Sequence, residues 1–293
     1  MFDRRHFLAG MAGLAADLLA PRAAGATDEP KLISDDYAEA RRRFRTHLLR
    51  NGPAPDQPQS LEPPAGARSM TYPSGSLDLV AWLSPAADPR RPAPAVLFLH
   101  GGNALWPGHW DLTKPYRDAG YIAMMPALRA ENGQSGAFSG FYDETEDVLA
   151  AAELLRQMPG VDPTRLFLAG HSVGGTLTLL AALAMPIFRA ACAFSPNPDA
   201  RAFFRRFPED IRFDASDPRE FDMRSAACFA GSIKCPMLML HGSEEHGSEQ
   251  AMQLMASRAE AAHLPVRRGV VPGSHTGAIP RETAESLAFF TAA

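Results

Sequence analysis

Apolar and polar residues follow two patterns along the chain, one typical of β-strands and one typical of α-helices, and these patterns predict its secondary structure. Short strand-like runs lie at 69–73, 77–84 and 93–102, and the third is nearly all apolar, which favours a strand covered on both faces. Strands and helices then alternate, with strands expected at 121–127, 165–170, 190–196, 235–242 and 266–273, and helices at 143–158, 173–185 and 248–263. This alternation predicts an α/β fold with an open, mostly parallel sheet flanked by helices.

Two segments depart from the alternation. Residues 196–233 carry many charges and aromatics before the next strand, and a structureless loop of that length is improbable in a compact domain, so a small helical insertion is expected. Residues 35–49 have helical spacing and are followed by a proline-rich strap at 53–67. We therefore predict an N-terminal helix and strap within 27–67 and a catalytic domain at 68–293.

The first 26 residues resemble an export signal. Arg4 and Arg5 precede an apolar stretch from Leu8 to Ala20, and the small-residue pattern at 24–26 fits a cleavage site. The apolar stretch is too short to span a bilayer comfortably. We expect a twin-arginine signal peptide, a mature chain beginning near Thr27 without a stable membrane span, and a periplasmic or secreted location in a bacterium.

Charge and cysteine content narrow the function classes. The net charge of −4 is small and both signs are mixed, so no nucleic-acid partner is expected. The basic run at 41–45 is typical of a solvated helix face. No metal-ligand spacing occurs, so we expect neither metal nor cofactor. Cys192 fits a core strand, whereas a disulfide between Cys228 and Cys235 is permitted but not required.

The stretch from Gly170 to Gly174 reads Gly-His-Ser-Val-Gly and sits between a predicted strand and a predicted helix. That context is typical of a sharp turn that exposes a nucleophilic serine at the end of a sheet. Glycines allow the close backbone approach that the turn requires. Ser172 is therefore the candidate nucleophile.

A serine nucleophile needs a base and an acid, and both follow in the chain. His275 lies in a Gly-Ser-His-Thr-Gly loop after the last strand, and Glu245 lies in the loop after the preceding strand. Both loops lie at the carboxyl ends of parallel strands, where a site assembles. Glu244 and Asp199 are the alternatives for the acid.

The amides of an oxyanion hole are expected in two places. Val173, the residue after the nucleophile, supplies one amide, and either Gly102 or Asn103 in the His-Gly-Gly-Asn loop supplies the other.

These stretches together resemble α/β-hydrolases, and more narrowly the prolyl oligopeptidase and dienelactone hydrolase branch. The likeness runs from about residue 69 to the C-terminus, through the stretches at 97–102, 121–136, 161–175, 236–245 and 270–277. It implies an α/β-hydrolase fold and an acyl-enzyme formed by Ser172, His275 and an acid. That branch commonly has aspartate where Glu245 stands.

The resemblance leaves the substrate open. The first hypothesis is an exported serine hydrolase that cleaves small carboxylic esters or related acyl bonds. The second is an oligopeptidase-like peptidase for short peptides, with Glu131 or Glu209 receiving the free amino terminus, although residues 27–67 are too few for the family's propeller. A non-catalytic protein with this fold is a third. Six aromatic residues are candidates for the site, although most of them fit the core equally well: Trp106, Trp110, Phe138, Phe141, Phe203 and Phe204.

Overall fold

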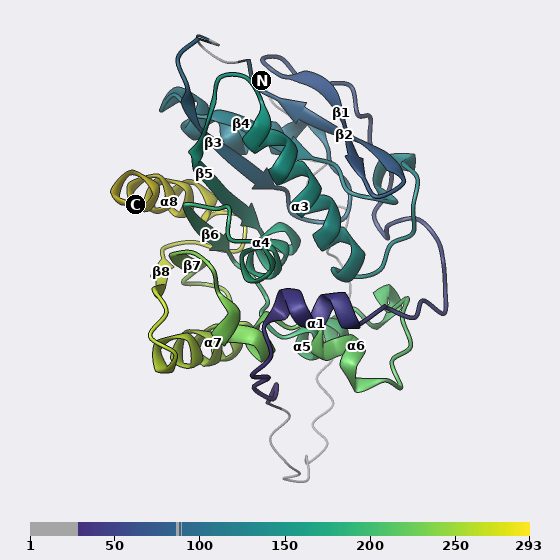
Figure 1. Ribbon diagram of the computed structural model, residues 1–293. Helices are drawn as coiled ribbons and strands as arrows, with labels where there is room; N and C mark the ends of the chain where they lie inside the picture. The colour runs from purple at the N-terminus through teal and green to yellow at the C-terminus, as the bar shows by residue number, and fades with distance from the viewer. Residues whose placement is uncertain (1–28, 86–87, 89) are drawn as a thin grey trace.

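A single eight-stranded sheet forms the centre of the molecule (Figure 1). The computed structural model describes residues 29–85, 88 and 90–293, so the expected signal peptide lies outside the described residues. The strands are β1 (Arg68–Ser74), β2 (Leu77–Leu83), β3 (Ala93–Leu99), β4 (Ile122–Pro126), β5 (Val161–His171), β6 (Ala190–Phe194), β7 (Met237–Gly242) and β8 (Val266–Val271).

The strand order across the sheet is β1-β2-β4-β3-β5-β6-β7-β8. The β1/β2 and β2/β4 pairs are antiparallel, and every pair from β4 to β8 is parallel. This confirms the mostly parallel sheet and the α/β-hydrolase fold. The parallel arrangement places the carboxyl ends of β3, β5, β6, β7 and β8 at one edge, where the functional loops gather.

Both faces of the sheet are buried, because successive side chains of a strand point to opposite sides. In β3, Leu97 and Leu99 pack in one hydrophobic cluster while Val96 and Phe98 pack in the other. The apolar character of 93–102 thus follows from its central position.

Helices cover the two faces. α3 (Tyr142–Gln157), α4 (Val173–Ala184) and α7 (Glu249–Ala261) bury their apolar residues in the first cluster. The short α2 (Lys114–Asp118), the 3₁₀ segment η1 (Pro107–Thr113) and the C-terminal α8 (Ile279–Ala292) pack on the second. A further 3₁₀ turn, η2 (Glu131–Gly133), follows β4. Among the described residues, no helix is both long and apolar enough to cross a membrane.

The segment at 196–233 forms the expected helical insertion. It consists of α5 (Ala200–Arg206), η3 (Pro208–Asp210), α6 (Pro218–Asp222) and η4 (Ala226–Ser232). The insertion meets the N-terminal helix α1 (Tyr37–Arg43), because the Tyr37 hydroxyl donates to the carbonyl of Met223, the C-cap of α6, at 2.8 Å (Figure 1).

The N-terminal helix is shorter than the expected 35–49. It ends at Arg43, since Phe44 is extended and the following residues bond to the insertion instead: the amide of His47 donates to Glu220 at 2.6 Å. The basic run at 41–45 is also not wholly solvated. Arg41 is buried, donates to Glu146 at 2.7 Å and lies over the Tyr142 ring.

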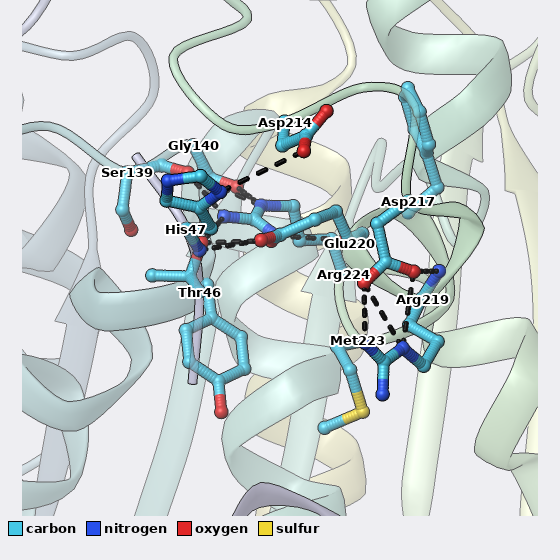
Figure 2. A network of polar contacts seen from close by, with 12 residues as sticks. Thr46, His47, Ser139, Gly140, Asp214, Asp217, Arg219, Glu220, Met223 and Arg224 are labelled. Atoms are coloured by element: carbon cyan, nitrogen blue, oxygen red, sulfur yellow. Dashed lines mark hydrogen bonds and ion pairs between the residues drawn. The ribbon is translucent and has the colours of Figure 1, made fainter. Parts of the chain in front are cut away.

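A buried ion pair fastens this N-terminal segment to the insertion (Figure 2). Arg224 donates to Glu220 at 2.5 Å, and neither side chain is more than 1% exposed. The guanidinium also donates to Thr46 Oγ1 at 2.7 Å and to the Ser139 carbonyl at 2.8 Å. One buried cation therefore joins three segments that are distant in sequence.

All three cysteines are free and buried, so Cys228 and Cys235 form no disulfide in the structure. Cys192 is fully buried in β6, as expected for a core strand.

Candidate active site

Ser172 lies at the turn between β5 and α4 in a strained backbone conformation. Its φ of 59° and ψ of −116° lie in a region that residues other than glycine rarely adopt. The turn is held by the Ser172 amide, which donates to the Phe194 carbonyl at 2.8 Å. The side chain is half-buried and faces the loops at the carboxyl edge of the sheet.

The glycines around Ser172 are required by close packing. A Cβ on Gly174 would lie 2.2 Å from the Leu99 carbonyl oxygen, and one on Gly170 would lie 2.4 Å from the Gly174 carbonyl oxygen. A Cβ on Gly175 would meet the Phe194 carbonyl oxygen at 2.6 Å. Helix α4 can therefore begin directly behind Ser172 only because these positions lack side chains.

The structure brings the three expected residues of the triad together. Ser172 Oγ lies 3.0 Å from His275 Nε2, and His275 Nδ1 lies 2.5 Å from Glu245 Oε2. This is the relay that serine hydrolysis needs: nucleophile to base, and base to an orienting carboxylate. The His275 side chain is 47% exposed, so the site is open to solvent and to substrates.

Glu245 is held by three hydrogen bonds. Besides the contact with His275, its Oε1 atom accepts from the Gly242 amide and from Ser195 Oγ, both at 2.6 Å. Burial by itself raises the pKa of this carboxyl, but the three hydrogen bonds outweigh that effect and lower the pKa to about 2. The carboxylate is therefore ionised at neutral pH.

The two alternatives for the acid lie elsewhere. Asp199 is the N-cap of α5 and accepts from the Arg201 amide at 2.9 Å. Glu244 is exposed, and its backbone amide donates to the Gly273 carbonyl at 3.0 Å.

Two residues near the triad gave no signal in the sequence. Ser195 follows β6 with a φ of +48° and donates to Glu245. His171, directly before the nucleophile, has its Nε2 atom 2.8 Å from the carbonyl oxygen of His275. A serine after a strand and a histidine before a serine are too common to single out, so only the fold reveals these contacts.

The two candidates for the second oxyanion donor differ in what surrounds them. The Asn103 amide donates to Asp56 Oδ2 at 2.6 Å, whereas no described residue accepts a hydrogen bond from the Gly102 amide. Gly102 has a φ of +71°, a backbone conformation that favours glycine. Val173 begins α4, where helical amides lack an intrahelical acceptor. Asn103 is therefore the weaker of the two alternatives, and the amides of Gly102 and Val173 remain the candidate donors.

Asp56 was not expected from the sequence, because it lies in the proline-rich strap. The strap is fastened beside the site by the Ala54 amide, which donates to the Ala130 carbonyl at 3.0 Å, and by Asn132 Nδ2, which donates to the Gln59 carbonyl at 2.8 Å. A Cβ on Gly102 would lie 2.8 Å from Asp56 Oδ2. An exposed carboxylate therefore borders the loop that carries Gly102, the candidate for the second oxyanion donor.

The carboxylates proposed to receive a peptide amino terminus are placed differently. Glu131 is buried and contacts His100 Nε2 at 3.1 Å and the Leu128 amide at 2.8 Å. Burial opposes a charged ring at His100, but the Glu131 carboxylate outweighs burial and raises the pKa of His100. Glu131 thus anchors the oxyanion loop, while Glu209 is exposed on the insertion.

For most of the candidate aromatic residues the structure favours the core. Trp110, Phe138, Phe141 and Phe204 are buried, Phe203 is half-buried against Phe141 and Phe207, and Trp106 is 38% exposed. Across the described residues, no group of three or more His, Cys, Asp or Glu side chains is arranged to hold a metal ion.

The sheet order, the serine turn and the Ser-His-Glu arrangement are those of a serine hydrolase of the α/β-hydrolase superfamily. The prolyl oligopeptidase family (Peptidase_S9) matches residues 111–290, which is more than half of the chain. The chain therefore belongs to the prolyl oligopeptidase family.

The chain is similar to both peptidases and esterases. An uncharacterized peptidase of Bacillus subtilis (strain 168), YtmA, is 24% identical over 218 residues, which cover 68% of this chain and 81% of YtmA. Dipeptidyl peptidase 4 of Porphyromonas gingivalis matches with a TM-score of 0.66 and 23% identity over 76% of this chain, but over only 35% of its own. Esterase 2 of Thermogutta terrifontis matches with a TM-score of 0.61 and 19% identity over 78% of this chain and 94% of its own.

Proposed function

We propose that the protein hydrolyses small carboxylic esters or related acyl bonds through an acyl-enzyme formed on Ser172. The observation that carries this proposal is the continuous line of contacts from Ser172 Oγ through His275 to Glu245. The His275 side chain is 47% exposed, so substrates can reach the base directly from solution.

In the first step, His275 Nε2 takes the proton of Ser172 as the serine oxygen bonds to the substrate carbonyl carbon. The carbonyl oxygen becomes negatively charged and is stabilised by the amides of Val173 and Gly102. His275 then gives its proton to the departing alcohol as the bond between the carbonyl carbon and the alcohol oxygen breaks. Water repeats the sequence on the acyl-enzyme and releases the acid, which restores Ser172.

Glu245 fixes the imidazole for both transfers. As an ionised acceptor for the Nδ1 hydrogen, it keeps Nε2 free to act as the base and stabilises the imidazolium that forms. The hydrogen bonds to the other carboxylate oxygen prevent Glu245 from rotating away.

A second candidate function, a peptidase for short peptides, is favoured by the family and by YtmA. Asp56 supports it as well, because an exposed carboxylate beside the oxyanion loop could pair with the α-ammonium group of a peptide. The chain spans 35% of the length of the dipeptidyl peptidase 4 it resembles, so that enzyme's substrates are not transferred to it.

Hydrolysis rates on a short-chain p-nitrophenyl ester and on aminoacyl and prolyl p-nitroanilides distinguish the esterase from the peptidase function, with Ser172→Ala as the blank. Ester turnover without anilide turnover supports the first proposal. Anilide turnover at a comparable kcat/KM, lost in the blank, would replace it with the peptidase.

We further propose export by the twin-arginine route, on the strength of Arg4, Arg5 and the apolar stretch that follows. Cell fractionation of the full chain and of an Arg4→Lys, Arg5→Lys double variant tests this. The proposal expects the wild type in the periplasm or medium and the variant in the cytoplasm, and equal distributions would contradict it.

A further inference from the structure

Beneath the triad lies a buried carboxyl group that the proposed mechanism does not use. Glu282, in the first turn of α8, is fully buried and has Oε1 3.3 Å from Ser195 Oγ. Its Oε2 atom has no hydrogen-bond partner, and no cation of the described residues lies within ion-pairing distance. An ionised carboxylate in such a position would pay a large cost of burial without compensation.

The single hydroxyl hydrogen of Ser195 can serve only one of the two carboxyl groups beside it, and this favours a protonated Glu282. A serine hydroxyl carries one hydrogen, and the ionised Glu245 oxygen, at 2.6 Å against 3.3 Å, is the nearer acceptor. With that hydrogen given to Glu245, Ser195 can only accept from Glu282. The contact is attractive when Glu282 carries a proton and repulsive when it does not.

We propose that Glu282 is a positioning residue for the catalytic acid: as a neutral carboxylic acid it donates to Ser195, which in turn holds Glu245 against His275. The inference rests on the proposed triad and extends it by two residues. Ionisation of Glu282 at alkaline pH breaks this chain of hydrogen bonds, so the same carboxyl makes the hydrolase sensitive to alkaline pH.

The surroundings of Glu282 support this assignment. Burial, followed by repulsion from Glu245, raises the pKa of Glu282 to about 8, against a smaller lowering by Ser195. Cys192 of β6 and Tyr116 of α2 also face it, but burial raises the pKa of both thiol and phenol well above their usual values, so both stay neutral. On α8 itself, Arg281 and Glu285 are exposed, and Arg281 donates to the Pro272 carbonyl.

Ionised Glu282 would affect the triad in two ways. Its carboxylate would compete for the single hydrogen of Ser195, which loosens one of the three bonds on Glu245. It would also place a second negative charge one serine hydroxyl away from Glu245. Both effects disturb the orientation of the carboxylate that faces His275, so turnover falls while the affinity for substrate changes little.

The test compares kcat and KM from about pH 6 to 9.5 for the wild type, Glu282→Gln and Ser195→Ala, with Glu285→Gln as the exposed control on the same helix and Ser172→Ala as the blank. Glutamine keeps a neutral donor toward Ser195 but cannot ionise. We expect the wild type and Glu285→Gln to lose about five- to tenfold in kcat with a midpoint near pH 8, and Glu282→Gln to keep its activity through that range. An unchanged alkaline decline in Glu282→Gln would overturn the proposal.

A measurement on the wild type keeps the proposal testable if Glu282→Gln does not fold. In protein labelled with ¹³C at the glutamate carboxyls, the proposal expects a carboxyl signal that titrates near pH 8 and persists in Glu144→Gln, which removes the other buried glutamate with a strongly raised pKa, about 7. Absence of such a signal would overturn it. Fluorophosphonate labelling of the same samples distinguishes failure of the proposed triad from failure of the proposed role of Glu282. An unlabelled wild type refutes the triad, whereas a labelled enzyme without the titration refutes only the role of Glu282.

Discussion

His171 Nε2 lies 2.8 Å from the backbone carbonyl of His275, although 104 positions separate the two residues in the chain. The two rings are 4.6 Å apart, so the residue before the nucleophile supports the loop that carries the base. Burial, and then the neighbouring His275, lower the pKa of His171 to about 4. The ring is therefore neutral near pH 7 and donates its Nε2 hydrogen to the carbonyl.

Replacing His171 should loosen the base without removing it. We expect His171→Phe to lower kcat on a p-nitrophenyl ester by about tenfold, since one hydrogen bond of roughly 1 to 1.5 kcal/mol no longer holds the loop. His263→Phe, at an exposed position after α7, is the control and should behave as wild type. An unaltered kcat in His171→Phe would show that the loop is positioned by other contacts.

Asp56 should influence substrate charge preference. Asp56→Asn keeps an acceptor for the Asn103 amide but removes the negative charge beside the oxyanion loop. A solvated charge at short range interacts with another charge by about 1 kcal/mol. For a neutral ester, Asp56→Asn removes repulsion of the developing oxyanion, so kcat/KM should rise about two- to fivefold. For substrates with a free α-ammonium group, the variant removes an attraction, so kcat/KM should fall by a similar factor.

Glu209→Gln is the matched control for that experiment, since Glu209 is an exposed carboxylate on the insertion. It should leave both classes of substrate unaffected. Equal changes in the Asp56 and Glu209 variants would point to net charge rather than to the position of Asp56.

The sequence predicted those parts of the site that depend on a local pattern. Ser172 stands between glycines where an added Cβ would lie 2.2 to 2.6 Å from backbone oxygens. This packing requirement can be recognised in the sequence because only glycine satisfies it. His275 and Glu245 follow strands whose apolar runs are clear. The mostly parallel sheet follows from the alternation of strands and helices, but the alternation alone does not give the strand order, in which β4 lies between β2 and β3.

The remaining parts depend on contacts between distant segments. Glu282 has the appearance of an ordinary acidic residue in the first turn of a helix, and only the fold turns it toward Ser195. The early helix was expected to reach residue 49 because its spacing is helical, but Glu220 of the insertion accepts the His47 amide and the chain is extended there. Tertiary hydrogen bonds outweighed a modest helical preference.

Glu282 also predicts a dependence of stability on pH. Its pKa is raised from 4.5 in the unfolded chain to about 8 in the folded one, so the folded state retains a proton that the unfolded state loses. Its stabilising contribution is complete below about pH 4.5 and is lost as the pH rises through about 8, at roughly 1.4 kcal/mol per pH unit as an upper bound. Urea unfolding should show Glu282→Gln gaining stability relative to the wild type across this range, and a constant difference would contradict the raised pKa.

The buried ion pair of Figure 2 should be important for stability. Arg224→Met leaves Glu220 buried without its cation and should cost about 3 to 5 kcal/mol in the free energy of unfolding. Arg219→Met, which removes an exposed arginine of α6 that pairs with the N-cap residue Asp217, should cause little change. Similar midpoints of urea unfolding for Arg224→Met and the wild type would show that the network does not fasten the insertion.

The most direct test of the central claim is the site of covalent labelling by a fluorophosphonate, read by mass spectrometry of the digested protein. The triad geometry predicts one adduct, on the peptide that contains Ser172, in the wild type, and none in Ser172→Ala. His275→Ala should label far more slowly, because the serine then lacks its base. Labelling that persists in Ser172→Ala, or an adduct on another residue of the wild type, would contradict the assignment of Ser172 as the nucleophile.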